Sequence, residues 1–227
     1  MEQQWKFEAV FFDLDGTLIE STLDIAISVN HVRTLLGMEP LPVGQVRRYV
    51  GDGVQVLFER ALETRDREII DRAVELWRPH YLEKCLVHTV LFDGVREMLE
   101  ELAVNGVRMA VITNKPRRPA EIILRGLKVM DYFDVVVGGD CTPTRKPEPE
   151  SFRLALEKME LSASPRILHV GDSPNDVDGA RNLGLSSGAV LWGHGTREDL
   201  KGADVVAQTV ADLIPLVRGN GEGPAWN

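Results

Sequence analysis

The stretch Val10-Phe11-Phe12-Asp13-Leu14-Asp15-Gly16-Thr17-Leu18 decides the fold of this chain. Its apolar residues, preceded by Phe7 and Ala9, predict a short buried strand, and carboxylates stand directly after that strand. Comparable apolar runs recur along the chain. We expect each to form a strand, the last at an edge of the sheet: 107–112, 133–137, 167–170, 188–191 and 203–207.

Amphipathic patterns with helical spacing lie between these runs, at 95–103, 119–127, 150–159 and 175–183. Short β-branched strands that alternate with helices are typical of a parallel sheet covered by helices on both faces. The sequence therefore predicts the α/β class with a doubly wound parallel sheet.

One long segment breaks this alternation, because from about Leu23 to Lys84 every pattern is helical. The helices are expected at 23–36, 43–49, 54–62 and 67–82. We interpret 18–89 as an all-helical domain inserted into an α/β core that consists of 1–17 and 90–218. The Gly-rich end, 219–227, is predicted to be a disordered tail.

Length and composition exclude several classes of protein. The 227 residues suffice for one large domain, or for one domain with a smaller companion. Asp and Glu number 35 against 26 Lys and Arg, a net charge of -9 that argues against nucleic-acid and anionic-membrane binding. Cys85 and Cys141 fit neither a disulfide framework nor a metal knuckle. With a polar start and no long apolar stretch, we expect a cytoplasmic protein, monomeric or homodimeric.

Polar side chains follow four of the expected strands, at the sheet edge where α/β proteins bind ligands. In chain order they are Asp13, Asp15, Thr113, Asn114, Lys146, Asp172 and Asp176. Crowded carboxylates need a cation between them, and oxygen ligands completed by a substrate phosphate suit Mg²⁺. A carboxylate can also attack phosphorus, while lysine and threonine side chains hold phosphoryl oxygens. Each element alone is usually a turn, a cap or a solvated side chain. Together they favour phosphoryl transfer through an aspartyl-phosphate.

Asp13-Leu14-Asp15-Gly16-Thr17-Leu18 resembles the first motif of the haloacid dehalogenase superfamily. Thr113, Lys146 and the segment 171–176 resemble its second, third and fourth motifs. The resemblance implies that Asp13 attacks phosphorus. It implies that Asp15 protonates the leaving alcohol and then deprotonates water, and that Thr113 and Lys146, with Asn114 close by, hold the phosphoryl oxygens.

The same resemblance implies a metal site and a cap. Asp13, the main-chain carbonyl of Asp15 and Asp172 would ligate Mg²⁺, and Asp176 would act through a metal-bound water or by supporting Lys146. The helical block resembles the small helical cap that one subfamily carries after the first motif.

Differences within the superfamily narrow the activity. Dehalogenases and phosphonate hydrolases lack an acid at the position of Asp15, and P-type ATPases have lysine where this chain has Leu14. Phosphonate hydrolases also need a cap lysine, and Lys84 fits poorly because it lies near the expected exit of the cap. Phosphatases and phosphomutases remain. The complete motif set argues against a non-catalytic binding module.

The cap segment around Arg47, Gly51 and Gly53 looks like that of phosphoglycolate phosphatases. An arginine beside a Gly-x-Gly turn can offer a guanidinium and backbone N–H groups to a substrate carboxylate, although a solvated arginine and a plain helix break also fit. The resemblance implies hydrolysis of 2-phosphoglycolate to glycolate and phosphate. Another small phosphorylated metabolite, pyrophosphate or a β-phosphoglucomutase-like reaction stays open. We expect His169 in the core and His194 in a surface role.

Overall fold

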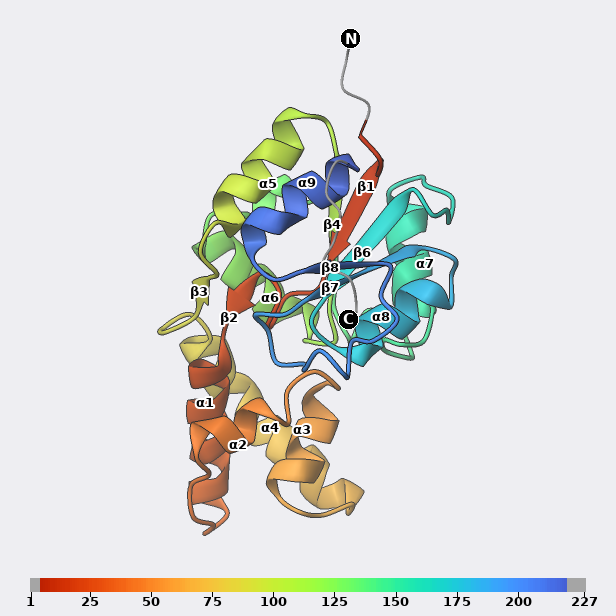
Figure 1. Ribbon diagram of the computed structural model, residues 1–227. Helices are drawn as coiled ribbons and strands as arrows, with labels where there is room; N and C mark the ends of the chain where they lie inside the picture. The colour runs from red at the N-terminus through yellow and green to blue at the C-terminus, as the bar shows by residue number, and fades with distance from the viewer. Residues whose placement is uncertain (1–4, 220–227) are drawn as a thin grey trace.

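The computed structural model describes residues 5–219; residues 1–4 and the part of the expected tail at 220–227 lie outside this range. Its central sheet has six parallel strands in the order β5-β4-β1-β6-β7-β8 (Figure 1). The strands are β1 (Ala9–Phe12), β4 (Arg108–Ile112), β5 (Val135–Val137), β6 (Ile167–Gly171), β7 (Ser186–Val190) and β8 (Val205–Ala207). The predicted doubly wound sheet is confirmed, and its weakest predicted strand, β8, lies at an edge.

Helices cover both faces of this sheet because neighbouring strand residues point in opposite directions (Figure 1). Val10 and Phe12 pack into the cluster that includes helices α5 (Val95–Val104), α6 (Arg117–Gly126) and α9 (Leu213–Arg218). Phe11 packs into the opposite cluster, with α7 (Glu150–Lys158) and α8 (Pro174–Arg181). Helix α9 and the short 3₁₀ turns η1 (Met130–Tyr132) and η2 (Val210–Asp212) were not predicted from the sequence.

The helical block lies as a cap beyond the carboxyl ends of the strands (Figure 1). It consists of α1 (Thr22–Leu35), α2 (Val43–Arg47), α3 (Val54–Ala61) and α4 (Arg67–Lys84). Aromatic packing joins α3 to α4, because the ring centroid of Phe58 lies 6.4 Å from that of Trp77, and Trp77 in turn stacks on Tyr81 of the same helix at 4.5 Å. Asp66 starts α4 by accepting hydrogen bonds from two backbone N–H groups of its first turn.

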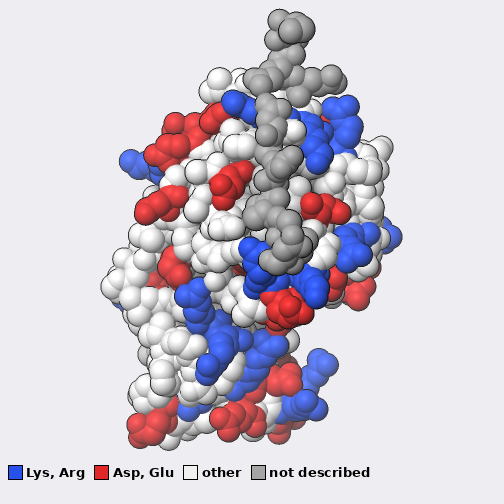
Figure 2. Space-filling model, viewed as in Figure 1, with Lys and Arg blue, Asp and Glu red and all other residues white. Residues whose placement is uncertain are grey.

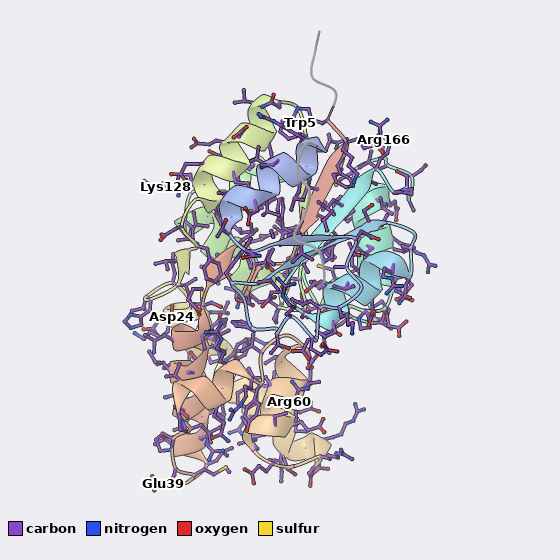
Figure 3. All side chains as sticks on the ribbon, in the orientation of Figure 1. Trp5, Asp24, Glu39, Arg60, Lys128 and Arg166 are labelled. Carbon is purple, nitrogen blue, oxygen red and sulfur yellow. The ribbon has the colours of Figure 1, made fainter. Side chains whose placement is uncertain are left out.

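The cap joins the core through a feature that sequence patterns did not predict. Strands β2 (Ile19–Glu20) and β3 (Val90–Leu91) pair antiparallel where the chain leaves and re-enters the core. Beside them, the buried carboxylate of Asp24 accepts hydrogen bonds from the N–H groups of Val87, His88 and Thr89, at 2.8–3.1 Å. Figure 3 shows Asp24 at this junction. A helix of the cap is thereby fixed to the segment that returns to the sheet.

Element boundaries differ from the predicted ones by a few residues. The strand expected at 133–137 begins at Val135, and Asp134, just before it, pairs with Arg108 at 2.9 Å. The strand expected at 188–191 begins earlier, at Ser186. Within residues 5–219, no helix is both long enough and apolar enough to cross a bilayer.

Candidate active site

The three central strands bring the predicted polar residues to one edge. Phe12 of β1 is in register with Val111 of β4 and Val170 of β6, so the residues that follow these strands converge. Asp13, Thr113 and Asp172 are 7%, 3% and 2% exposed, respectively. Strand connections diverge to the two sides of β1, which is the place where open α/β sheets bind ligands.

Lys146 joins two carboxylates beneath this edge. Its Nζ lies 2.9 Å from Oδ1 of Asp13 and 2.6 Å from Oδ1 of Asp176, and it donates to the carbonyl oxygen of Ile112. Both carboxylates raise the pKa of Lys146 against the effect of burial, which would lower it. The lysine therefore stays charged in a buried position.

Asp176 is fully buried and both of its oxygens are engaged. Oδ1 also lies 2.9 Å from Nε2 of His169, while Oδ2 accepts hydrogen bonds from the N–H and hydroxyl of Ser173, which precedes α8. Burial would raise the pKa of Asp176, but the Lys146 ammonium and the His169 hydrogen bond hold it below the ordinary range. His169 is buried as predicted, and it contributes by supporting this carboxylate.

The pKa values of Asp13 and Asp172 are shifted in the opposite direction from that of Asp176. Burial raises the pKa of Asp13 to about 6, opposed by Lys146 and reinforced by the charge of Asp176. Burial, together with the charges of Asp13 and Asp176, also raises the pKa of Asp172. Oxygens of the three carboxylates lie within 4.8 Å of one another. A cation would relieve this crowding, so the donor set fits a hard divalent ion such as Mg²⁺.

Glycines make the space around Asp172 possible. A Cβ on Gly16, whose φ is +83°, would lie 2.1 Å from Oδ2 of Asp172, and a Cβ on Gly193 would lie 2.4 Å from the same oxygen. The N–H of His194 donates to Oδ2 at 2.6 Å. The expectation of a surface role for His194 is wrong: its side chain is 10% exposed, and its Nδ1 lies 3.5 Å from the Asp172 carboxylate. The reason is that the loop after β7 folds back over the site.

Asp15 belongs to a second cluster, adjacent to the first. Lys115 donates to both of its carboxylate oxygens at 2.9 Å, and the hydroxyl of Ser21 donates to Oδ1 at 2.5 Å. All three residues are buried. Sequence reasoning gave Lys115 no role, although it directly follows Thr113 and Asn114 at the end of β4. The only signal was its place at a strand end, because Asp15 lies a hundred positions away in the chain.

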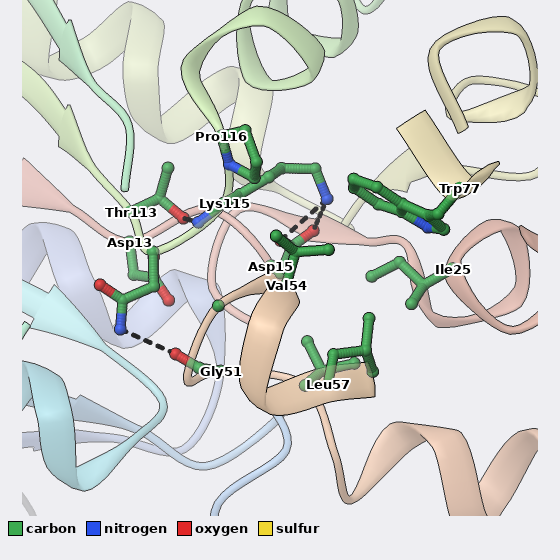
Figure 4. A pocket seen from close by; sticks show the side chains of 13 residues that line it. Asp13, Asp15, Ile25, Gly51, Val54, Leu57, Trp77, Thr113, Lys115 and Pro116 are labelled. Atoms are coloured by element: carbon green, nitrogen blue, oxygen red, sulfur yellow. Dashed lines mark hydrogen bonds and ion pairs between the residues drawn. The ribbon is translucent and has the colours of Figure 1, made fainter. Parts of the chain in front are cut away.

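A small cavity of about 50 Å³ opens from these carboxylates toward the cap (Figure 4). The core contributes Asp13, Asp15 and residues 113–116. The cap contributes mainly apolar side chains, together with the Gly51 and Gly53 backbone: Ile25, Val50, Val54, Leu57 and Trp77. The site therefore combines a charged floor with an apolar roof.

The cap contacts the core through polar groups around this cavity. The amide of Asn114 donates to the carbonyl oxygen of Gly51 at 2.9 Å, so Asn114 ties the cap turn to the core. Arg47 does not line the cavity; its guanidinium donates to the carbonyl oxygen of Gly193 at 2.7 Å. Asp52 accepts from Asn175 at 2.7 Å and pairs with Arg60 at 2.6 Å. Figure 2 shows basic side chains gathered where cap and core meet on this face.

Comparison with known proteins agrees with this architecture. The family model for haloacid dehalogenase-like hydrolases matches residues 10–190. A phosphoglycolate phosphatase of Nitrosospira multiformis is 35% identical over 218 residues, which cover 93% of this chain and 96% of that protein. A phosphoglycolate phosphatase of Aquifex aeolicus is 34% identical over 208 residues, covering 92% and 95%.

Solved structures share the whole fold. The crystal structure of a predicted phosphoglycolate phosphatase from Haemophilus somnus has a TM-score of 0.86 and 28% identity, over 93% of this chain and 98% of that one. A predicted phosphatase from Clostridium acetobutylicum has a TM-score of 0.83 and 28% identity, over 91% and 96%. The similarity thus extends through both the sheet and the helical cap.

Proposed function

Because the chain belongs to the haloacid dehalogenase-like hydrolases, we propose that it is a Mg²⁺-dependent phosphatase that hydrolyses 2-phosphoglycolate to glycolate and phosphate. The observation that carries this proposal is the buried cluster in which Lys146 bridges Asp13 and Asp176 beside Asp172. A carboxylate on one side and a fixed cation on the other suit an in-line attack on a phosphoryl group. The relatives named phosphoglycolate phosphatase support the choice of substrate.

In the proposed reaction, an oxygen of Asp13 attacks phosphorus and the bond to the leaving oxygen breaks. Asp15 gives a proton to that oxygen, and glycolate leaves. A water then attacks the phospho-aspartate, Asp15 takes a proton from it, and phosphate departs with Asp13 restored. Ser21 and Lys115 hold the Asp15 carboxylate in a fixed place for both proton transfers.

The remaining residues stabilise charge. Lys146 and the Thr113 hydroxyl would hold the phosphoryl oxygens, where negative charge gathers in the transition state. Asp13 and Asp172, with the main-chain carbonyl of Asp15, would hold Mg²⁺, which adds positive charge at those oxygens when bound. Asp176 supports Lys146, since both of its own oxygens already accept hydrogen bonds.

The test is phosphate release from a panel of phosphomonoesters, including 2-phosphoglycolate, sugar phosphates and pyrophosphate, with Mg²⁺ and with chelator. We expect the highest kcat/KM on 2-phosphoglycolate and no turnover with chelator. Asp13→Asn should abolish the activity, while Asp71→Asn, a change at an exposed position of α4, should leave it intact. Equal rates with chelator would contradict the metal requirement, and a preference for sugar phosphates would contradict the substrate.

A further inference from the structure

The cavity above Asp13 contains a single cationic side chain among its lining residues. That residue is Lys115; the cap side of the cavity contributes no Lys or Arg. Arg47, which the sequence suggested as the carboxylate-binding residue, does not line the cavity, and its guanidinium donates to the carbonyl oxygen of Gly193. If the leaving group of the substrate carries a negative charge, Lys115 is therefore the cation that the cavity offers to it.

Lys115 is held between the Asp15 carboxylate and the Tyr81 ring, with the Tyr81 hydroxyl near enough to act on the pKa of the ammonium. An ammonium has three N–H donors, and two of them reach the oxygens of Asp15. Within residues 5–219, no second carboxylate pairs with it. Its Nζ lies 4.8 Å from the centre of the Tyr81 ring, and Figure 4 shows its end beside Trp77. The cation is thus fixed between the core and an aromatic part of the cap.

The cap also supplies buried polar atoms at this place. Nε1 of Trp77 and the hydroxyl of Tyr81 are buried, and in the described part of the chain neither makes a hydrogen bond of normal geometry. Such groups cost free energy unless a partner reaches them. Burial raises the pKa of Tyr81, so its hydroxyl keeps a proton to donate. Of these two residues, Trp77 lines the cavity, whereas Tyr81 lines the adjoining groove.

The chemistry of the reaction places an anion close to Lys115. Asp15 protonates the leaving oxygen in the proposed reaction, so that oxygen must come within hydrogen-bond distance of the Asp15 carboxylate. Lys115 lies 2.9 Å from the same carboxylate. In 2-phosphoglycolate only one carbon separates the leaving oxygen from the carboxylate of the substrate. The short chain brings that carboxylate to the ammonium, whereas an uncharged leaving group would not use it.

We propose that Lys115 determines substrate specificity by binding the carboxylate of the leaving group, beside the aromatic side chains of Trp77 and Tyr81. This inference rests on the proposed phosphatase function and assigns a substrate class to it, the short phosphorylated 2-hydroxy acids. The apolar roof then contacts the carbon atoms of the substrate and excludes water from the ion pair. In this account Arg47 only fastens the cap to the loop after β7.

The experiment compares two substrates that differ in this group, 2-phosphoglycolate and 2-hydroxyethyl phosphate, on the wild type, Lys115→Met and Lys115→Arg. Lys115→Met will slow both reactions because Asp15 loses its partner. In addition to this common loss, the ratio of kcat/KM for 2-phosphoglycolate to kcat/KM for 2-hydroxyethyl phosphate should fall about 10- to 100-fold, about the effect of one charge-assisted hydrogen bond. Lys115→Arg should restore part of that preference. An unchanged ratio in Lys115→Met would overturn the proposal.

A control variant and a binding measurement complete the test. Arg118→Met removes an exposed cation of the adjoining groove. It should leave the preference unchanged, and a fall there instead would place the carboxylate in that groove and overturn the assignment. In Lys115→Met, calorimetry with 3-phosphonopropanoate and propylphosphonate measures the same preference without turnover. Failure of the proposed function can be told apart from failure of the Lys115 proposal. In the former case the wild type itself would release no phosphate from 2-phosphoglycolate while releasing it from another ester.

Discussion

Without metal, the contribution of Asp13 to the stability of the folded protein should fall as the pH rises from 5 to 7.5. Burial, with the charge of Asp176, raises its pKa in the folded protein from 3.8 to about 6, despite Lys146. The folded state therefore binds this proton more tightly than the unfolded chain does. The stability that depends on the proton is complete below pH 3.8 and is lost as the pH rises through about 6.

The size of the effect follows from the shift. The rise of the Asp13 pKa from 3.8 to about 6 corresponds to about 3 kcal/mol of stability in full. About half of this, on the order of 1 to 2 kcal/mol, falls between pH 5 and pH 7.5, because the proton already leaves the unfolded chain below pH 5. The raised pKa of Asp172 adds a loss of the same sign. Mg²⁺ between the two carboxylates should cancel the loss, since it binds their charged forms.

The assay is urea unfolding of the wild type and Asp13→Asn at pH 5.0 and pH 7.5, with chelator and with Mg²⁺. His169 and His194 have pKa values lowered by burial and contribute the opposite trend, but they titrate in both proteins and cancel in the difference. With chelator, the free energy of unfolding of the wild type relative to Asp13→Asn should fall by about 1 to 2 kcal/mol over this range. A constant difference would refute the account of Asp13.

Three further perturbations test other parts of the site. Gly193→Ala places a Cβ against Asp172 and should raise the Mg²⁺ concentration for half-maximal activity at least tenfold. Gly44→Ala, with open space around it, should leave that concentration unchanged. A titration of the activity with Mg²⁺ measures both effects. Asp24→Asn removes the charge that accepts the junction N–H groups, so chemical unfolding should show a loss of about 1.5–3 kcal/mol. Asp52→Asn weakens the contacts between cap and core and should raise KM more than it lowers kcat; equal changes in both would speak against a cap-closing role.

The sheet and the floor of the site were predictable because they depend on local patterns. Apolar runs gave the strands, and the rule that parallel strands end at one edge placed Asp13, Thr113 and Asp172 together. Strands β2 and β3 were not predictable, since two residues carry no period.

The residues that sequence reasoning missed or misplaced depend on contacts between distant segments. Lys115 donates a hydrogen bond to Asp15, a hundred positions away in the chain, and Arg47 of the cap donates one to the carbonyl oxygen of Gly193 in the core. His194 looked like a surface residue because nothing in its own loop shows that the loop covers Asp172. The orientation of a long side chain is set by packing, which a single sequence does not reveal.

The most direct test of the central claim is chemical trapping of the phosphorylated residue. The enzyme is mixed with 2-phosphoglycolate and Mg²⁺, quenched in acid during turnover, and reduced with borohydride, which converts phospho-aspartate to homoserine; peptide mass spectrometry then locates the change. The account predicts homoserine at position 13, only when substrate is present. Continued turnover with Asp13 unmodified, or with the label at another carboxylate, would contradict it.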